Sequence, residues 1–87
     1  MIALSKHARE QAARRGLSEE IVLAVARAPE QRLVVRPGRE LRQSRVVMPT
    51  GGTLYLIRVV VDAGPSDDET VVTVYPTSKI EKYWSKA

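Results

Sequence analysis

Apolar residues recur at helical spacing in the first third of the chain. The pattern predicts one helix from Ser5 to Arg15, with Ser5 as its N-cap and Gly16 as its left-handed exit. A second helix is expected after Ser18 and stops at Pro29. Its apolar side consists of Ile21, Val22, Val25 and Ala28. Because the link between the two helices is short, we expect them to form a helical hairpin.

After Pro29 the pattern changes to that of β-strands. The predicted strands cover residues 33–35, 40–48, 53–61 and 70–75. Turns are expected at residues 37–38 and 49–52, and an acidic loop at 62–69. The segment 53–61 is apolar on both faces, which is typical of a central strand covered on two sides. Short turns favour an antiparallel meander.

The C-terminal segment predicts a third helix. Ser78 and Glu81 match the capping box that starts many helices. Ile80, Tyr83 and Trp84 share one side, which favours packing on the sheet over stacking on a nucleic-acid base. The expected order is α-α-β-β-β-β-α. The fold class is α+β: one domain over residues 1–87, with an N-terminal helical hairpin packed on a four-stranded antiparallel sheet and a short C-terminal helix.

The amino-acid composition limits the ligands and cofactors that the protein is expected to bind. The net charge is +4, and ten of the 14 basic residues are arginines, which suit phosphate and carboxylate groups. With one histidine and no cysteine, neither a metal site nor another cofactor is expected. We find no signal peptide and no apolar run long enough to span a membrane, so we expect a cytoplasmic protein. The oligomeric state is left open.

Three segments resemble the DUF4258 family. They are Ser5–Glu10 with Arg15–Glu20, the turn Pro37–Arg39, and the closing run Val72–Trp84. Members of this family resemble small toxins with the RelE/ParE and barnase-like arrangement, in which helices precede an antiparallel sheet. The resemblance implies metal-independent RNA cleavage, or a surface that binds an antitoxin. This sequence departs from the pattern at Gln11 and Ala12, where related sequences often carry Arg-Met.

His7 is the first candidate for catalysis. It is the only side chain whose unperturbed pKa lies near neutrality, and it shares a helical stripe with Gln11 and Arg14. Positive charge on Arg14 or Arg15 would disfavour the imidazolium and keep a neutral base. The alternative is an exposed helix residue that bonds to a loop carbonyl.

Arg58 is the second candidate, because it interrupts an otherwise apolar strand face. A charge there can line a site for a ligand such as phosphate. The alternatives are a salt bridge to Asp or Glu of a neighbouring strand or helix, or a side chain that extends to the edge of the sheet. The complete catalytic hypothesis assigns His7 as base or acid, Arg15 and Arg58 as phosphate clamps, and Tyr75 or Thr77 as a hydrogen-bond donor.

The remaining basic residues are candidates for contact with nucleic acid. This set is Arg14, Arg39, Arg42, Arg45, Lys79 and Lys82. On the strand, Arg39 and Arg45 should share one face while Arg42 takes the other. A patch divided in this way is equally typical of a solvated edge that resists pairing between sheets.

Two functions follow from these residues. The first is a metal-independent RNA-cleaving domain of the toxin–antitoxin type. The second is an interaction module without catalysis, which binds nucleic acid or an acidic, antitoxin-like protein through a strand edge.

Overall fold

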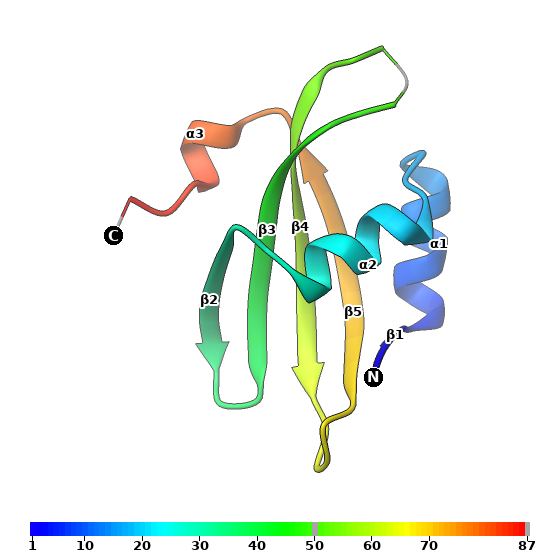
Figure 1. Ribbon diagram of the computed structural model, residues 1–87, viewed down its shortest axis with the longest axis vertical. Coiled ribbons are helices and arrows are strands. Elements are labelled where there is room, and N and C mark those ends of the chain that lie inside the picture. The colour runs from blue at the N-terminus through cyan, green and yellow to red at the C-terminus, as the bar shows by residue number, and fades with distance from the viewer. Residues whose placement is uncertain (50, 87) are drawn as a thin grey trace.

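The protein is built on one mixed β-sheet flanked by three helices (Figure 1). The computed structural model describes residues 1–49 and 51–86. In chain order the elements are β1 (Ile2–Leu4), α1 (Lys6–Arg14), α2 (Glu19–Arg27), β2 (Gln31–Arg36), β3 (Arg39–Val47), β4 (Leu54–Ala63), β5 (Glu69–Thr77) and α3 (Ile80–Tyr83). The α+β class is therefore confirmed.

The expectation of four antiparallel strands is inexact, because a fifth strand opens the chain. The sheet order is β1-β5-β4-β3-β2, and β1 pairs parallel to β5. Strand β1 was not predicted, because three residues are too few for a periodic pattern. The antiparallel meander from β2 to β5 is correct. Its last two strands extend further than predicted, and the acidic loop shrinks accordingly.

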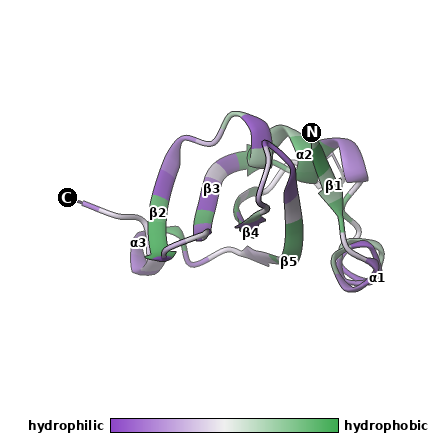
Figure 2. Ribbon diagram, turned by 90° about the horizontal axis from the view of Figure 1, so that it is seen from below, coloured by the Kyte–Doolittle hydropathy of each residue, from purple (hydrophilic) through white to green (hydrophobic). Residues whose placement is uncertain are grey.

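The two N-terminal helices occupy different places around the sheet. Helix α2 crosses one face, whereas α1 lies beside the β5 edge (Figures 1 and 2). The side chain of Gln11 fixes α1 there, because its Oε1 accepts a hydrogen bond of 3.0 Å from the backbone N–H of Val74. The predicted helical hairpin at the start of the chain is therefore also inexact: the sheet, more than helix-to-helix contact, positions both helices.

The helix caps were predicted with mixed success. Ser5 and Ser18 are N-caps as expected, and their hydroxyls accept hydrogen bonds from Ala8 N and Ile21 N. The prediction of a capping box formed by Ser78 and Glu81 is wrong. Helix α3 has Lys79 at its N-cap position and no capping side chain. The backbone N–H of Lys79 instead donates to Thr77 Oγ1 at 3.1 Å.

The main core lies between α2, α1 and the sheet. Strand β4 contributes Ile57, Val59 and Val61, and β5 contributes Val71 and Val74. The helices meet them with small or branched side chains, namely Ala8, Ala12, Val22, Val25 and Ala26. We call this side of the sheet the helix face. Small alanines allow the helix backbone to approach the strands closely, which favours dispersion contacts in a thin core.

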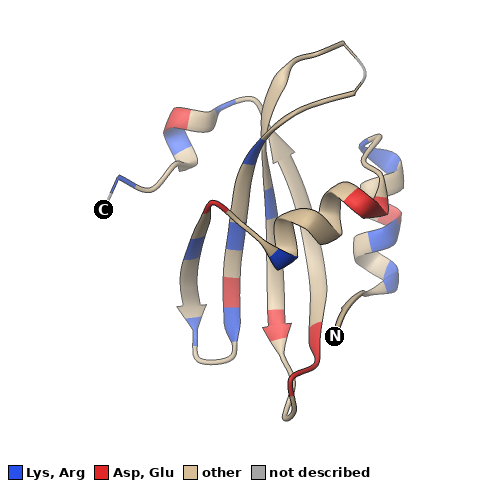
Figure 3. Cartoon of the chain, in the orientation of Figure 1, with Lys and Arg blue, Asp and Glu red and all other residues tan. Residues whose placement is uncertain are grey.

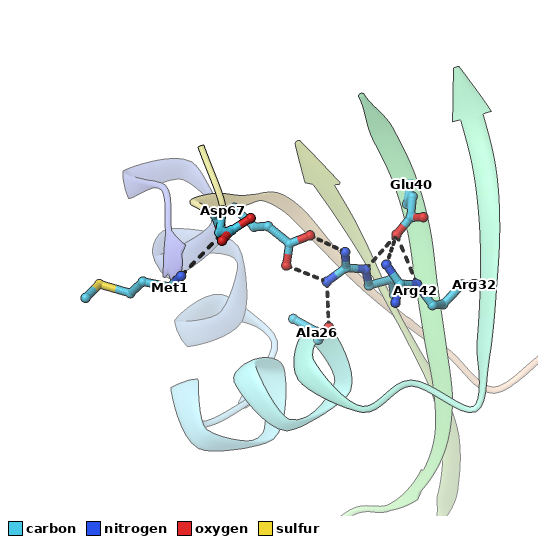
Figure 4. A network of polar contacts seen from close by, with 7 residues as sticks. Met1, Ala26, Arg32, Glu40, Arg42 and Asp67 are labelled. Atoms are coloured by element: carbon cyan, nitrogen blue, oxygen red, sulfur yellow. Dashed lines mark hydrogen bonds and ion pairs between the residues drawn. The ribbon is translucent and has the colours of Figure 1, made fainter. Parts of the chain in front are cut away.

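A buried arginine ties α2 to the helix face (Figure 4). Arg42 is only 4% exposed, and it donates to the carbonyl of Ala26 at 2.7 Å. The same guanidinium binds both carboxylate oxygens of Glu69, and its Nε donates to Glu40 at 2.9 Å. Hydrogen bonding to Arg42 holds the pKa of Glu69 below its usual value. Because Ala26 is near the end of α2, this cation also complements the helix dipole.

Replacing Arg42 should therefore destabilise the fold. We expect Arg42→Ala to lower the free energy of unfolding by about 3 kcal/mol, since it leaves the Glu69 carboxylate and the Ala26 carbonyl without their partner, whereas Glu40 keeps Arg32. Urea denaturation followed by circular dichroism measures this difference. The matched control is Arg27→Ala on the exposed end of α2, which should change stability by less than about 0.5 kcal/mol. Equal effects of the two substitutions would show that the Arg42 network is not a major source of stability.

Candidate nucleic-acid interface

The face of the sheet opposite α2 is only partly covered. Figure 2 shows α2 on one side of the sheet and α3 on the other, beneath β2 and β3. We call the side that carries α3 the open face. At its centre, Arg58 of β4 stands between Gln43 of β3 and Tyr75 of β5, which are its cross-strand partners. Together with Tyr83, the last residue of α3, these residues form what we call the Arg58 cluster.

Arg58 has no carboxylate partner among the residues that the structure describes. Its Nε donates to Gln43 Oε1 at 3.0 Å, and its guanidinium carbon lies 4.3 Å from the centroid of the Tyr83 ring. Burial lowers the pKa of Arg58, although the nearby tyrosines oppose that shift. The predicted alternative of a salt bridge is thus not realised in residues 1–49 and 51–86. A partly buried cation held in this way is suited to binding an anion.

Two glutamines, Gln43 and Gln31, hold the Arg58 cluster in place through hydrogen bonds. Gln43 is fully buried, and its Nε2 donates to Gln31 Oε1 at 2.7 Å and to the carbonyl of Tyr83 at 3.1 Å. Gln31 donates in turn to the carbonyl of Ser85 at 2.7 Å and accepts from its N–H at 3.1 Å. This network holds the segment after α3 against the sheet. Neither glutamine was predicted as a site residue, because a polar strand residue carries no signal of the partner it meets.

The two tyrosines of the cluster meet edge to face. The centroids of Tyr75 and Tyr83 are 6.0 Å apart, with an interplanar angle of 87°. The pKa of the Tyr83 hydroxyl lies below its usual value, because Tyr75 can donate a hydrogen bond to the phenolate and because Lys82 and Arg58 are positively charged. Tyr75 itself is 38% exposed. The cluster therefore joins a cation, an accessible ring and a hydroxyl that is more acidic than usual.

A second arginine on the open face is neutralised within the protein. Arg45 forms a bidentate pair with Glu30, with N···O distances of 3.2 and 2.9 Å. Its guanidinium also lies over the ring of Trp84, 4.3 Å from the centroid. Arg39 is likewise paired, with Asp62 at 2.8 Å. As predicted, these two arginines share one face, whereas Arg42 lies on the other.

The acidic residues of the sheet explain why Arg58 is unpaired. Figure 3 shows the acidic residues of β3, β4 and β5 near the end where β2 turns into β3. There Glu40, Asp62 and Glu69 bind Arg32, Arg39 and Arg42. In the middle of the open face, Arg58 has no such carboxylate partner among the described residues. Because Arg42 is buried and fully engaged, it is unavailable to a nucleic acid, contrary to the prediction.

The other predicted site residues fall in three places. Thr77 is buried and accepts a hydrogen bond from the N–H of Lys79 in the turn before α3, so it does not line the surface. Lys79 and Lys82 are exposed around α3, and Lys82 Nζ lies 5.3 Å from the centroid of the Tyr83 ring. The last group, His7, Arg14 and Arg15, is exposed on and just after α1 at the β5 edge.

The structure does not bring His7 into the Arg58 cluster. In the described part of the chain, none of the hydrogen bonds or ion pairs joins His7, Arg14 or Arg15 to Arg58 or Tyr75. Gln11, on the same helical stripe as His7, is occupied with the backbone of β5. The loop carbonyl that was the alternative partner of His7 is not observed either. The four residues expected to converge are thus divided between the edge and the centre of the sheet.

Comparison with known proteins assigns a family. The model of the domain of unknown function DUF4258 matches residues 4–76. The chain belongs to the DUF4258 family. No curated protein and no solved structure matches the chain. The match includes Arg58 and Tyr75 but ends before Tyr83, so the family domain contains the sheet of the Arg58 cluster without its α3 cover.

Metal-binding groups and membrane-spanning helices are two further features to consider. In residues 1–49 and 51–86, no three His, Asp or Glu side chains are grouped closely enough to hold a metal ion. Within the same residues, no helix has the length and apolarity required to cross a membrane.

The acidity of Tyr83 can be measured directly. In an alkaline titration followed by phenolate absorbance, part of the signal of the folded protein should rise below the usual tyrosine pKa of 10.0. That early component should disappear in Tyr83→Phe. It should move to higher pH in Tyr75→Phe, because the hydrogen-bond donor to the phenolate is lost. The denatured protein is the control, and an early component that persists in Tyr83→Phe would contradict the assignment.

Proposed function

We propose that this DUF4258 domain binds RNA on its open face and cleaves it without a metal ion. The observation that carries the proposal is Arg58: a partly buried guanidinium, oriented by Gln43 and the ring of Tyr83, with no carboxylate partner in the described chain. A phosphodiester is the anion that suits such a fork, and the exposed Tyr75 ring supplies a surface on which a base can stack. The net charge of +4 favours the encounter with RNA.

The proposed reaction needs no reagent beyond the RNA itself. The ribose 2′-oxygen attacks the adjacent phosphorus and gives its proton to a base. The bond from phosphorus to the 5′-oxygen breaks, and that oxygen takes a proton from an acid. The products are a 2′,3′-cyclic phosphate and a free 5′-hydroxyl. Arg58 would stabilise the charge that develops on the phosphate oxygens.

The tyrosines are the groups of the cluster that can transfer protons. Tyr83 has the lowered pKa and therefore serves as the base, while the hydroxyl of Tyr75 serves as the acid. His7 was the base or acid expected from the sequence, but no hydrogen bond or ion pair joins it to Arg58 in the described residues. We therefore assign proton transfer to the tyrosines of the open face. The effect of replacing His7 is compared with theirs in the assay below.

An RNA cleavage assay in the presence of EDTA tests this function. We expect Arg58→Lys to lower the cleavage rate about 100-fold, because lysine retains the charge but loses the planar fork. Tyr83→Phe should lower the rate more than His7→Ala. The matched control is Arg27→Lys, an exposed arginine on α2, which should cleave like the unchanged protein.

Each unfavourable result of the assay has a definite meaning. Intact RNA after incubation with the unchanged protein, at any substrate length, excludes the proposed function. Cleavage that requires His7 but not Tyr83 would transfer catalysis to the β5 edge. Cleavage that disappears on adding EDTA would require a metal and would exclude this mechanism.

A second candidate function is supported by the edge strand β2. Val34 and Val35 are 74% and 57% exposed, and the outer side of β2 has no partner strand among the described residues. Arg32 and Arg36 flank them. In an antiparallel pairing of two copies centred on Val34, Arg32 would oppose Arg36 of the second copy, and like charges in this position are destabilising. The edge therefore favours an acidic strand from another protein.

Co-expression with a small acidic protein encoded beside this chain tests the second candidate. A complex seen by size-exclusion chromatography should weaken about tenfold on Arg36→Glu, because that substitution reverses the charge next to the edge. Arg27→Glu, at an exposed site on α2, and His7→Ala should leave the complex intact. A complex that tolerates both Arg36→Glu and Val34→Asp is bound by another surface.

A further inference from the structure

A cavity beside α3 is separate from the Arg58 cluster. Its volume is about 460 Å³, which is within the usual range of small-ligand sites. Its lining consists of Arg45, Leu54, Ile80, Glu81, Trp84 and Lys86. The walls thus combine an indole and two aliphatic side chains with two cations and one carboxylate. We call it the Trp84 cavity.

Two large apolar side chains of the sheet are exposed beside the Trp84 cavity. Val47 and Leu54 form a cross-strand pair at the ends of β3 and β4, and they are 62% and 45% exposed. Leu54 is also part of the cavity wall. An apolar surface continuous with an aromatic side chain suits a flat ring whose polar groups are confined to its edge. A nucleobase has this form.

The Trp84 ring is fixed before any ligand binds. Arg45 lies 4.3 Å from its centroid, and Glu30 holds Arg45 through both guanidinium and backbone N–H groups. Cation–π contact of this kind stabilises the position of an indole. A wall that is already ordered loses little conformational entropy when a base packs against it.

The Trp84 cavity is next to Arg58 on the open face, because Arg45 in its wall is a neighbour of Arg58 across two strands. Arg45 is the cross-strand partner of Leu56, so Arg45 and Arg58 are diagonal neighbours on the same face of adjacent strands. Such neighbours are about 7–8 Å apart, which is within the reach of one nucleotide. Trp84 also follows Tyr83 directly in the chain. An RNA strand with a phosphate at Arg58 can therefore put an adjacent base at Trp84.

We propose that the Trp84 cavity binds a guanine base of the RNA, with the Glu81 carboxylate reading its edge. The inference rests on the proposed function and adds a base preference to it. Among the four RNA bases only guanine presents two adjacent N–H donors, N1–H and the N2 amino group, which a carboxylate can accept together. Adenine, cytosine and uracil each place an acceptor oxygen or nitrogen beside their donor, which a carboxylate repels. None of the ion pairs in the described residues occupies Glu81.

The only tryptophan of the chain makes this site observable. Because the sequence has a single tryptophan, fluorescence quenching on nucleotide addition reports Trp84 alone. Titration with guanosine 5′-monophosphate should quench the signal at lower concentration than the adenosine, cytidine or uridine monophosphates. Glu81→Gln keeps one acceptor of the two, so it should raise the dissociation constant for the guanosine nucleotide about tenfold. The matched control is Glu20→Gln, an exposed glutamate on α2, which should change nothing.

The outcomes separate this inference from the proposed function. Equal quenching by the four nucleotides, equal quenching by inorganic phosphate, or no quenching at all overturns the guanine site. Arg58→Lys should lower the RNA cleavage rate about 100-fold while the guanosine nucleotide still quenches Trp84, and this result supports both proposals. Quenching without RNA cleavage by the unchanged protein overturns the proposed function alone. Cleavage without a guanine preference at Trp84 overturns the inference alone.

Discussion

The Arg42 network is the constraint on which the rest of the arrangement depends. A charged side chain in the middle of the helix face can be buried only if its donors are satisfied. Glu40, Glu69 and the carbonyl of Ala26 provide this, and in doing so they join β3, β5 and the end of α2. The orientation of α2 over the sheet is thereby set by hydrogen-bond geometry as well as by apolar packing.

The placement of the carboxylates in the sheet also bears on the charge of the opposite face. The carboxylates of the sheet are gathered at the hairpin end, where Arg32, Arg39 and Arg42 use them. Arg58, in the middle of the open face, has an amide and an aromatic ring as neighbours instead. Two arginines on adjacent strands are thus buried to different degrees on opposite faces, one neutralised by the fold and one left for an anion. That asymmetry is the physical basis for placing an RNA site on the open face.

The C-terminal segment covers part of the open face and also supplies side chains to the proposed site. Its contacts with the sheet are made largely through backbone groups of Tyr83 and Ser85, which Gln43 and Gln31 bind. The side chains of Tyr83 and Trp84 are left to pack on Arg58 and Arg45. The sequence analysis treated packing on the sheet and stacking on a base as alternatives for Tyr83 and Trp84. Their positions in the structure are compatible with both.

The sequence by itself determined most of the secondary structure. Helix caps at Ser5 and Ser18 and the four long strands depend on interactions between near neighbours, which a local pattern records. It also identified Arg58 as a charge on an apolar strand and assigned Arg39 and Arg45 to one face, because side chains alternate along a strand. The mismatch at α3 is local too, since the hydroxyl of Thr77 accepts from the N–H of Lys79 just before the helix and no side chain caps the helix itself.

Only the tertiary structure decided the pairing of distant groups. Strand β1 exists because β5 offers it a free edge, and the burial of Arg42 depends on Glu69, 27 residues away. The separation of His7 from Arg58 follows from the position of α1 beside β5, which Gln11 fixes through a backbone group 63 residues later. Composition and periodicity carry no information on such partners, because a side chain's neighbours across the sheet are set by register and helix placement.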